Sequence, residues 1–206
     1  MAMKEDKNKI PVKFRNIKKS FMDTISLNNN YSFMSFPKEL NFHGKEKGEQ
    51  VVLIIRSHWI VTVPYFFLAI LVFILPFILA SLMPTFFSSI ALLISLVIIS
   101  LLVSLGIVVS TFVKWFYTVH IITDQKVVDL DFTSIMNHSM AEAQLERIED
   151  VTHKQLGAIG SIFDVGSVYI QTAGAQNEIE FTNVPRPRDV QDILFDLLEL
   201  KQKGEI

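Results

Sequence analysis

The sequence predicts an α+β membrane protein in which a two-helix transmembrane hairpin precedes an antiparallel β domain capped by a C-terminal helix. Three observations predict this fold class. Residues 57–113 contain no Asp, Glu, Lys or Arg. Beyond Lys114 the continuous apolar run gives way to alternating apolar and polar residues, which is typical of strands. The stretch 189–201 then returns to helical spacing of its apolar residues.

The uncharged run is long enough for two membrane crossings and a turn, because about 20 helical residues cross a hydrocarbon core about 30 Å thick. Met83-Pro84-Thr85 marks the turn, so the predicted helices are about 59–83 and 86–113 within a hairpin of residues 57–114. Pro64 falls in a first helical turn, where its missing N–H costs little. Pro76 lies deeper in the same helix and predicts a kink.

The flanks of the hairpin predict its orientation. The connection between the two helices carries no charge, whereas residues 1–47 contain ten Lys and Arg against five Asp and Glu. By the positive-inside rule, both termini of this multi-pass chain lie on the cytoplasmic side of the cell membrane. Four residues at the outer ends of the hairpin are predicted membrane-interface anchors: Arg56, Trp59, Lys114 and Trp115.

The hairpin is predicted to anchor the chain and not to conduct or transport. Ion and proton paths are usually marked by charged residues inside the membrane, and this run has none. Two pairs of small residues, Ser100/Ser104 and Gly106/Ser110, have the spacing of close helix contacts. We expect them to line the contact between the two helices or a dimer contact.

Residues 1–48 are predicted to form a basic tail that contains an amphipathic helix at about 11–27. Its apolar positions recur at near-helical spacing from Phe14, and the candidate lipid-contacting residues are Lys13, Arg15, Lys18 and Lys19. Two interpretations stay open, a helix in the headgroup layer of the membrane and a disordered or loosely packed tail. Residues 31–47 are expected to be an irregular linker.

The β domain is predicted over residues 115–206, with six or seven antiparallel strands and a final amphipathic helix at about 188–202. The strand candidates are 115–123, 126–132, 138–145, 147–153, 165–172 and 178–183. Residues 49–56 are either a first strand, which joins this sheet from before the hairpin, or a pre-membrane segment. Gly157, Gly160 and Gly166 are expected to mark a loop.

Catalytic chemistry is not predicted for this chain. There is no cysteine, no metalloprotease, nucleophile-elbow or phosphate-loop motif, and no pair of histidines at i,i+4 spacing. Asp129 and Asp131 alternate as on a solvated strand, and His120 is interpreted as a strand residue. The sequence therefore predicts no enzyme, with no catalytic residue, cofactor site or metal site. It also gives no sign of a nucleic-acid partner or a small-molecule substrate.

Several segments carry a resemblance to a known family: YTVHIITDQKVV, LERIEDVTHKQLGAIGSIFDVGSVYIQTAG, the NV before the last helix, and Arg56-Ser57-His58-Trp59 at the membrane entry. Together these segments resemble the bacterial pleckstrin-homology-like (PH-like) membrane proteins of the YdbS type, over roughly residues 49–200. The resemblance implies a PH-like antiparallel β-barrel or sandwich closed by the C-terminal helix. One departure is the turn at Gln125 and Lys126, where the family is commonly more basic.

The charge of the β domain bears on what such a module binds. Residues 117–206 contain seven Lys and Arg against fifteen Asp and Glu, and the basic residues are spread along the chain. Recognition of a phosphorylated headgroup needs several cations at one place, so the sequence disfavours it. We expect a membrane-anchored interaction or scaffold module on the cytoplasmic face, whose partner is another protein or a second copy. The alternatives are a lipid sensor that uses the basic N-terminal segment, and an accessory subunit of a transport or envelope system.

Overall fold

The computed structural model describes residues 14, 32–37, 44–134, 137–173 and 178–206. The chain forms two compact units. The helical unit contains Trp59–Tyr117 together with Phe132–His138. The strand-rich unit contains Thr118–Asp131, Ser139–Ile206 and the described residues up to His58.

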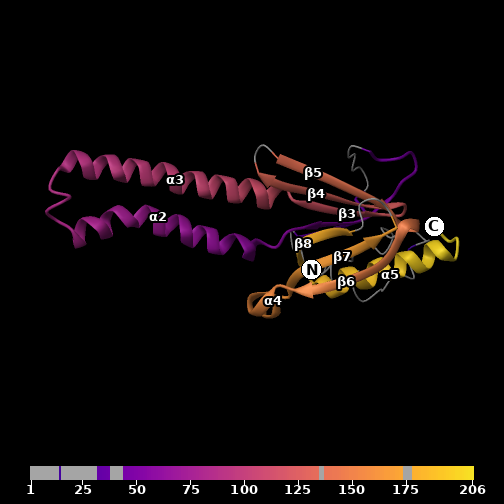
Figure 1. Ribbon diagram of the computed structural model, residues 1–206. Helices are drawn as coiled ribbons and strands as arrows, with labels where there is room; N and C mark the ends of the chain where they lie inside the picture. Colours follow the sequence, from indigo (N-terminus) through magenta and orange to yellow (C-terminus); the bar gives the residue numbers. More distant parts are fainter. Residues whose placement is uncertain (1–13, 15–31, 38–43, 135–136, 174–177) are drawn as a thin grey trace, which may run out of the picture. The chain divides into compact units, whose positions relative to one another are not determined.

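Two long helices lie side by side in the helical unit (Figure 1). A short 3-10 helix, η2 (Trp59–Thr62), leads into α2 (Val63–Leu82), and α3 (Ile90–Tyr117) follows after a turn. Pro64 occupies the first turn of α2, and the helix continues through the buried Pro76. Most of their large apolar side chains are exposed.

The second helix begins and ends later than the sequence predicts. The backbone N–H groups of Phe86 and Phe87 both donate to the carbonyl of Met83, at 3.1 and 3.2 Å, so this stretch forms a turn. At the other end, residues 115–117 belong to α3 and not to a strand. The rings of Trp115 and Phe116 both pack on Phe112, each with centroids 5.9 Å apart, as positions i+3 and i+4 of a helix do.

The larger sheet has five antiparallel strands in the order of the sequence. They are β1 (Phe33–Ser35), β2 (Val51–Arg56), β3 (Val119–Thr123), β4 (Lys126–Ser134) and β5 (Asn137–Gln144). β2 pairs with β3 in a register that places Arg56 opposite Val119. The helical hairpin is therefore inserted between two neighbouring strands of one sheet. β1 lies in the stretch that the sequence predicts as irregular linker.

The smaller sheet has three antiparallel strands, β6 (Ile148–Gln155), β7 (Val165–Thr172) and β8 (Glu178–Pro185). A 3-10 turn, η3 (Leu145–Arg147), connects β5 to β6. The predicted loop between β6 and β7 is wrong, because residues Gly157–Phe163 form the helix α4. The last helix, α5 (Pro187–Gln202), packs on β6 and β7 (Figure 1) through five buried apolar residues: Val190, Ile193, Leu194, Leu197 and Leu200.

One hydrophobic core receives residues from both sheets and from α5. Leu53 and Ile122 come from the larger sheet, Ile170 and Phe181 from the smaller, and all are fully buried. In the described part of the chain neither sheet closes on itself. Of the two predicted forms, barrel or sandwich, the barrel is therefore wrong. The fold is α+β, with two antiparallel sheets of five and three strands.

Candidate membrane anchor and hairpin junction

The two long helices contact each other through small residues near their middle. Ser104 Oγ donates to the carbonyl oxygen of Ala69 at 2.9 Å, and Ala69 and Ser100 are buried. Ser110 is exposed and donates to Ile107 of its own helix. The structure therefore brings the predicted Ser100/Ser104 pair into the contact between α2 and α3, and it leaves the Gly106/Ser110 pair outside this contact.

Three of the four predicted interface anchors lie at the outer ends of these helices. Trp59 begins η2 with 54% of its surface exposed, and Lys114 and Trp115 lie in the last turns of α3. Arg56 is the exposed last residue of β2. Both helices are long and apolar enough to cross a membrane by length and composition.

A polar network surrounds the residues through which the chain leaves β2 and enters β3. We call it the hairpin junction: Ser57, His58 and Thr118–His120 with their partners on β4 and β8. The backbone N–H of His58 donates to the carbonyl oxygen of Asn183 at 2.9 Å. Thr118 Oγ1 donates to Asp131 Oδ1 at 3.3 Å. The two chain segments that lead to the helices are thus tied to β8 and β4.

His120 is the buried centre of the junction. Its imidazole Nδ1 lies 2.6 Å from Asp129 Oδ1 on β4, and Nε2 lies 3.1 Å from the carbonyl oxygen of Thr182 on β8. Because a carbonyl oxygen only accepts, Nε2 carries a proton. The ring also stacks on Phe181 with centroids 4.7 Å apart. His120 therefore links the two sheets, a role that its position in a strand pattern does not reveal.

The junction also accounts for the paired acidic residues of β4. Asp129 is engaged by His120 and Asp131 by Thr118, so the two carboxylates serve different partners. Within the described residues no group of three or more His, Cys, Asp or Glu is arranged to hold a metal ion. Nearby, burial lowers the pKa of His58 below its ordinary value of 6.5.

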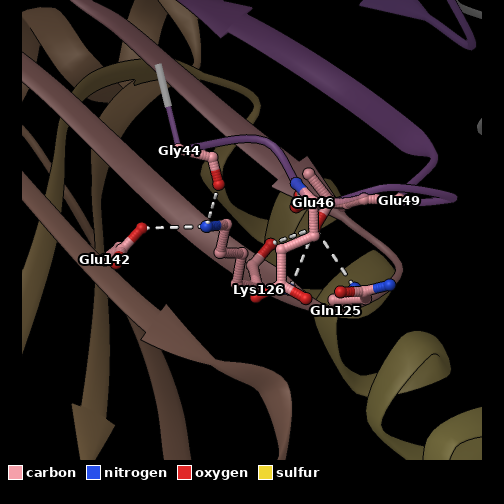
Figure 2. A network of polar contacts seen from close by, with 7 residues as sticks. Gly44, Glu46, Glu49, Gln125, Lys126 and Glu142 are labelled. Carbon is pink, nitrogen blue, oxygen red and sulfur yellow. Dashed lines mark hydrogen bonds and ion pairs between the residues drawn. The ribbon is translucent and has the colours of Figure 1, made fainter. Parts of the chain in front are cut away.

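A second polar network lies at the opposite end of the larger sheet, at the turn between β3 and β4. Figure 2 shows the side chain of Lys126 between Gly44 and Glu142. Lys126 Nζ donates to the carbonyl oxygen of Gly44 at 2.7 Å and to Glu142 Oε2 at 3.0 Å, and only 7% of the residue is exposed. Both of these contacts lie within the fold, so the ammonium of Lys126 does not provide a positive charge at the surface.

Comparison with protein families gives the identity of the fold. The profile described as the bacterial PH domain matches residues 59–198, which are 140 of the 206 residues. The chain belongs to the bacterial PH domain family. The match begins at Trp59, so it spans the two helices and the strands from β3 to β8, and it leaves out β1 and β2. No curated protein and no solved structure matches the chain.

Membership in the bacterial PH domain family indicates a module that interacts with protein or lipid. In this bacterial PH domain most basic side chains of residues 117–206 have partners within the fold. Lys201 and Lys203 pair with Glu146 and Glu199, at 3.5 Å and about 2.5 Å. Lys154 Nζ lies 4.9 Å from the ring centroid of Tyr169.

The candidate lipid-contacting residues of this bacterial PH domain protein, Lys13, Arg15, Lys18 and Lys19, lie outside the described residues. Phe14, which lies on the apolar side of the predicted amphipathic helix, is described. It is 1% exposed in the core of the strand-rich unit, with its ring centroid 5.4 Å from that of Phe36. Phe14 therefore packs against protein.

Proposed function

We propose that this bacterial PH domain protein is a membrane-anchored interaction module without catalytic activity of its own. In this proposal α2 and α3 cross the bilayer as a hairpin, and the strand-rich unit binds a protein partner on the cytoplasmic side. The same proposal assigns the protein to the YdbS type within this family.

The observation that carries the anchor is the surface of the two helices. The helical stretches are 24 and 28 residues long. At about 1.5 Å per residue each exceeds the hydrocarbon thickness of about 30 Å. A helix on the surface of a soluble domain keeps a polar face, whereas these helices are apolar on all sides and expose Phe67, Leu71 and Leu102 by 68, 58 and 63%. Such a surface fits lipid.

The topology gives the anchor a mechanical consequence. The hairpin leaves from β2 and returns to β3, which are hydrogen-bonded neighbours, and both exits are tied to the fold at the hairpin junction. A domain held at two adjacent points has less freedom to lose when it meets a partner. The basic flanks of the hairpin favour the cytoplasmic side for both termini.

The sheet edges differ in how well they suit a partner strand. β6 exposes Glu149, Asp150 and Lys154 and has a register irregularity between Ile148 and Asp150, features that discourage strand addition. β5 pairs only with β4 in the described sheet. Glu142 on β5 carries a negative charge, which is already paired with Lys126. We therefore place the protein partner at β5.

Site-specific photocrosslinking in native membranes tests this proposal. A photoreactive amino acid replaces Met140 on β5, and a matched variant carries it at Thr152 on β6, since both residues are exposed. We expect a discrete crosslinked product from position 140 that is absent from position 152. Identical products from both positions, or none from position 140, would contradict the assignment. A product of twice the chain mass identifies a second copy as the partner.

The alternative of a lipid sensor through the basic N-terminal segment has one observation against it. The ring of Phe14 is buried in the protein core, although an interfacial helix would need it at the lipid surface. For an accessory role in a transport or envelope system, no feature of the described residues adds support.

A further inference from the structure

Half of the exposed large apolar side chains in the described part of the strand-rich unit lie at one place. Six of its described large apolar residues are exposed: Met34, Met140, Leu156, Ile162, Phe163 and Phe195. Three of the six lie in residues 156–163, which are α4 and the residue before it. Leu156, Ile162 and Phe163 are exposed by 48, 77 and 46%. No Asp, Glu, Lys or Arg lies in residues 156–163. This apolar tip therefore differs from the remaining, largely polar surface of the unit.

The backbone holds the apolar tip in place. A Cβ on Gly160 would lie 2.4 Å from the carbonyl oxygen of Val165, and one on Gly166 would lie 2.1 Å from that of Lys154. Only glycine permits such approach, so α4 is packed closely on the start of β7. The N–H of Leu156 donates to Val165 at 3.0 Å. The exposed apolar side chains are consequently presented on a fixed support.

The tip lies at the end of the smaller sheet from which the chain departs for α2. Val165 and Gly166 pair with Pro185 and Val184 on β8, and the next residue, Asn183, accepts the hydrogen bond from His58. Trp59, the first residue of the apolar helices, follows directly. With strands about 5 Å apart and residues about 3.3 Å apart along a strand, the start of β7, which follows the tip, lies about 12 Å from this exit. Figure 1 shows α4 at this end of β6 and β7.

Basic residues border the tip. Lys154 precedes it on β6, and the N–H of Arg186 donates to the carbonyl oxygen of Asp164 at 2.7 Å, directly after α4. Arg188 follows and is exposed. Two carboxylates lie at the same place: Gln155 Nε2 donates to Asp164 Oδ1 at 3.4 Å, and Asp189 Oδ2 lies 4.0 Å from Arg186 Nη1. Three basic residues against two carboxylates leave a net positive charge at this border. Apolar side chains beside such a charge suit the boundary between acyl chains and anionic headgroups.

We propose that Leu156, Ile162 and Phe163 on α4 insert into the headgroup and acyl boundary of the bilayer that the hairpin crosses. This inference rests on the proposed function, because it needs that bilayer at the exit from the strand-rich unit. The tip adds a third point of attachment beside the two ends of the hairpin. It fixes the face that the module turns to the membrane, and it recognises apolar surface and general negative charge without reading a particular headgroup.

Fluorescence quenching in vesicles tests the proposal on the full chain. The sequence has no cysteine, so Ile162→Cys provides a single site for an environment-sensitive fluorophore. The labelled protein is reconstituted into phosphatidylcholine and phosphatidylglycerol vesicles with and without a shallow doxyl lipid. Gln171→Cys, exposed at the other end of β7, is the matched control, and Leu101→Cys on α3 reports the hairpin itself.

We expect loss of emission by doxyl lipid at positions 162 and 101 and none at 171. Adding Phe163→Glu to Ile162→Cys should reduce the quenching at position 162, whereas adding Phe163→Leu should preserve it. Quenching at 101 without quenching at 162 overturns this inference and leaves the anchor intact, including the case in which the tip meets a protein. Equal quenching at 162 and 171 also overturns it. Absence of quenching at 101 contradicts the proposed anchor as well.

Discussion

His120 and Asp129 form a pair between neighbouring strands, with 2.6 Å between Nδ1 of the imidazole and Oδ1 of the carboxylate. The imidazole is fully buried and its other nitrogen reaches Thr182 on the second sheet. Because a buried polar group without a partner is costly, the fold depends on both contacts at once. This arrangement holds β3, the strand that follows the helical hairpin, to β4 and to β8.

Replacement of His120 is expected to destabilise the strand-rich unit strongly. His120→Ala removes a buried ring and leaves the Thr182 carbonyl and the Asp129 carboxylate unpaired, at a cost of about 3 kcal/mol. Asp129→Asn keeps the shape and should cost about 1 kcal/mol. Thermal unfolding and pulse proteolysis in detergent measure both, with the exposed Thr152→Ala as the control. A His120→Ala protein as stable as this control would contradict the buried link.

His58 makes the stability of the protein depend on pH. Burial lowers its pKa below 6.5 in the folded state, so protonation favours the unfolded state. The contribution is fully present above pH 6.5 and is lost as the pH falls from there through the lowered folded value. Unfolding midpoints measured between pH 7.5 and 5 should drop more steeply for the native chain than for His58→Asn. Parallel curves for the two proteins would count against this assignment.

Two glycines are expected to be irreplaceable by alanine, and a third is not. Gly160→Ala and Gly166→Ala place a Cβ within 2.4 and 2.1 Å of backbone oxygens, so each should cost about 3 kcal/mol or more. Gly106→Ala, in α3, meets nothing within 4 Å and should be neutral or slightly stabilising. Unfolding midpoints of the three variants test this expected difference between the glycines. Equal effects at 160 and 106 would exclude the close packing of α4 on β7.

The ion pair of Lys126 and Glu142 is expected to respond unequally to loss of either partner. The Lys126 side chain is 9% exposed and that of Glu142 is 53% exposed. Glu142→Ala leaves the buried ammonium of Lys126 without its carboxylate partner and should cost about 2 kcal/mol. Lys126→Met leaves a carboxylate that water can solvate and should cost less than about 1 kcal/mol. Urea unfolding in detergent compares the two. The opposite order would show that the ammonium is better solvated than its burial indicates.

Features encoded locally could be predicted from the sequence. The uncharged run located the helical hairpin, and the alternation of residues 165–172 gave β7 with the same bounds. The apolar spacing from Val190 onward gave α5. In each case neighbours along the chain share one environment, so the pattern itself contains the information.

Features that depend on contacts between distant residues could not be predicted from the sequence. His120 meets Thr182 across 62 positions, and a strand pattern does not reveal that partner. The glycines around α4 suggest a loop, although they serve the close approach of a helix to β7. Phe14 has the spacing of an amphipathic helix, and nothing local indicates that its ring enters the core. The same limit applies to the barrel, because closure depends on pairing between distant strands.

The measurement that tests the central claim most directly is cysteine labelling from the two sides of the membrane in intact bacterial cells. The chain has no cysteine, so Ser88→Cys, in the turn between the helices, and Gln171→Cys, on β7, each report one position. If the helices span the bilayer with the strand-rich unit inside, an impermeant maleimide labels Ser88→Cys in intact cells and Gln171→Cys only after permeabilisation. Labelling of Gln171→Cys in intact cells, or protection of Ser88→Cys until permeabilisation, would contradict the membrane-anchored module.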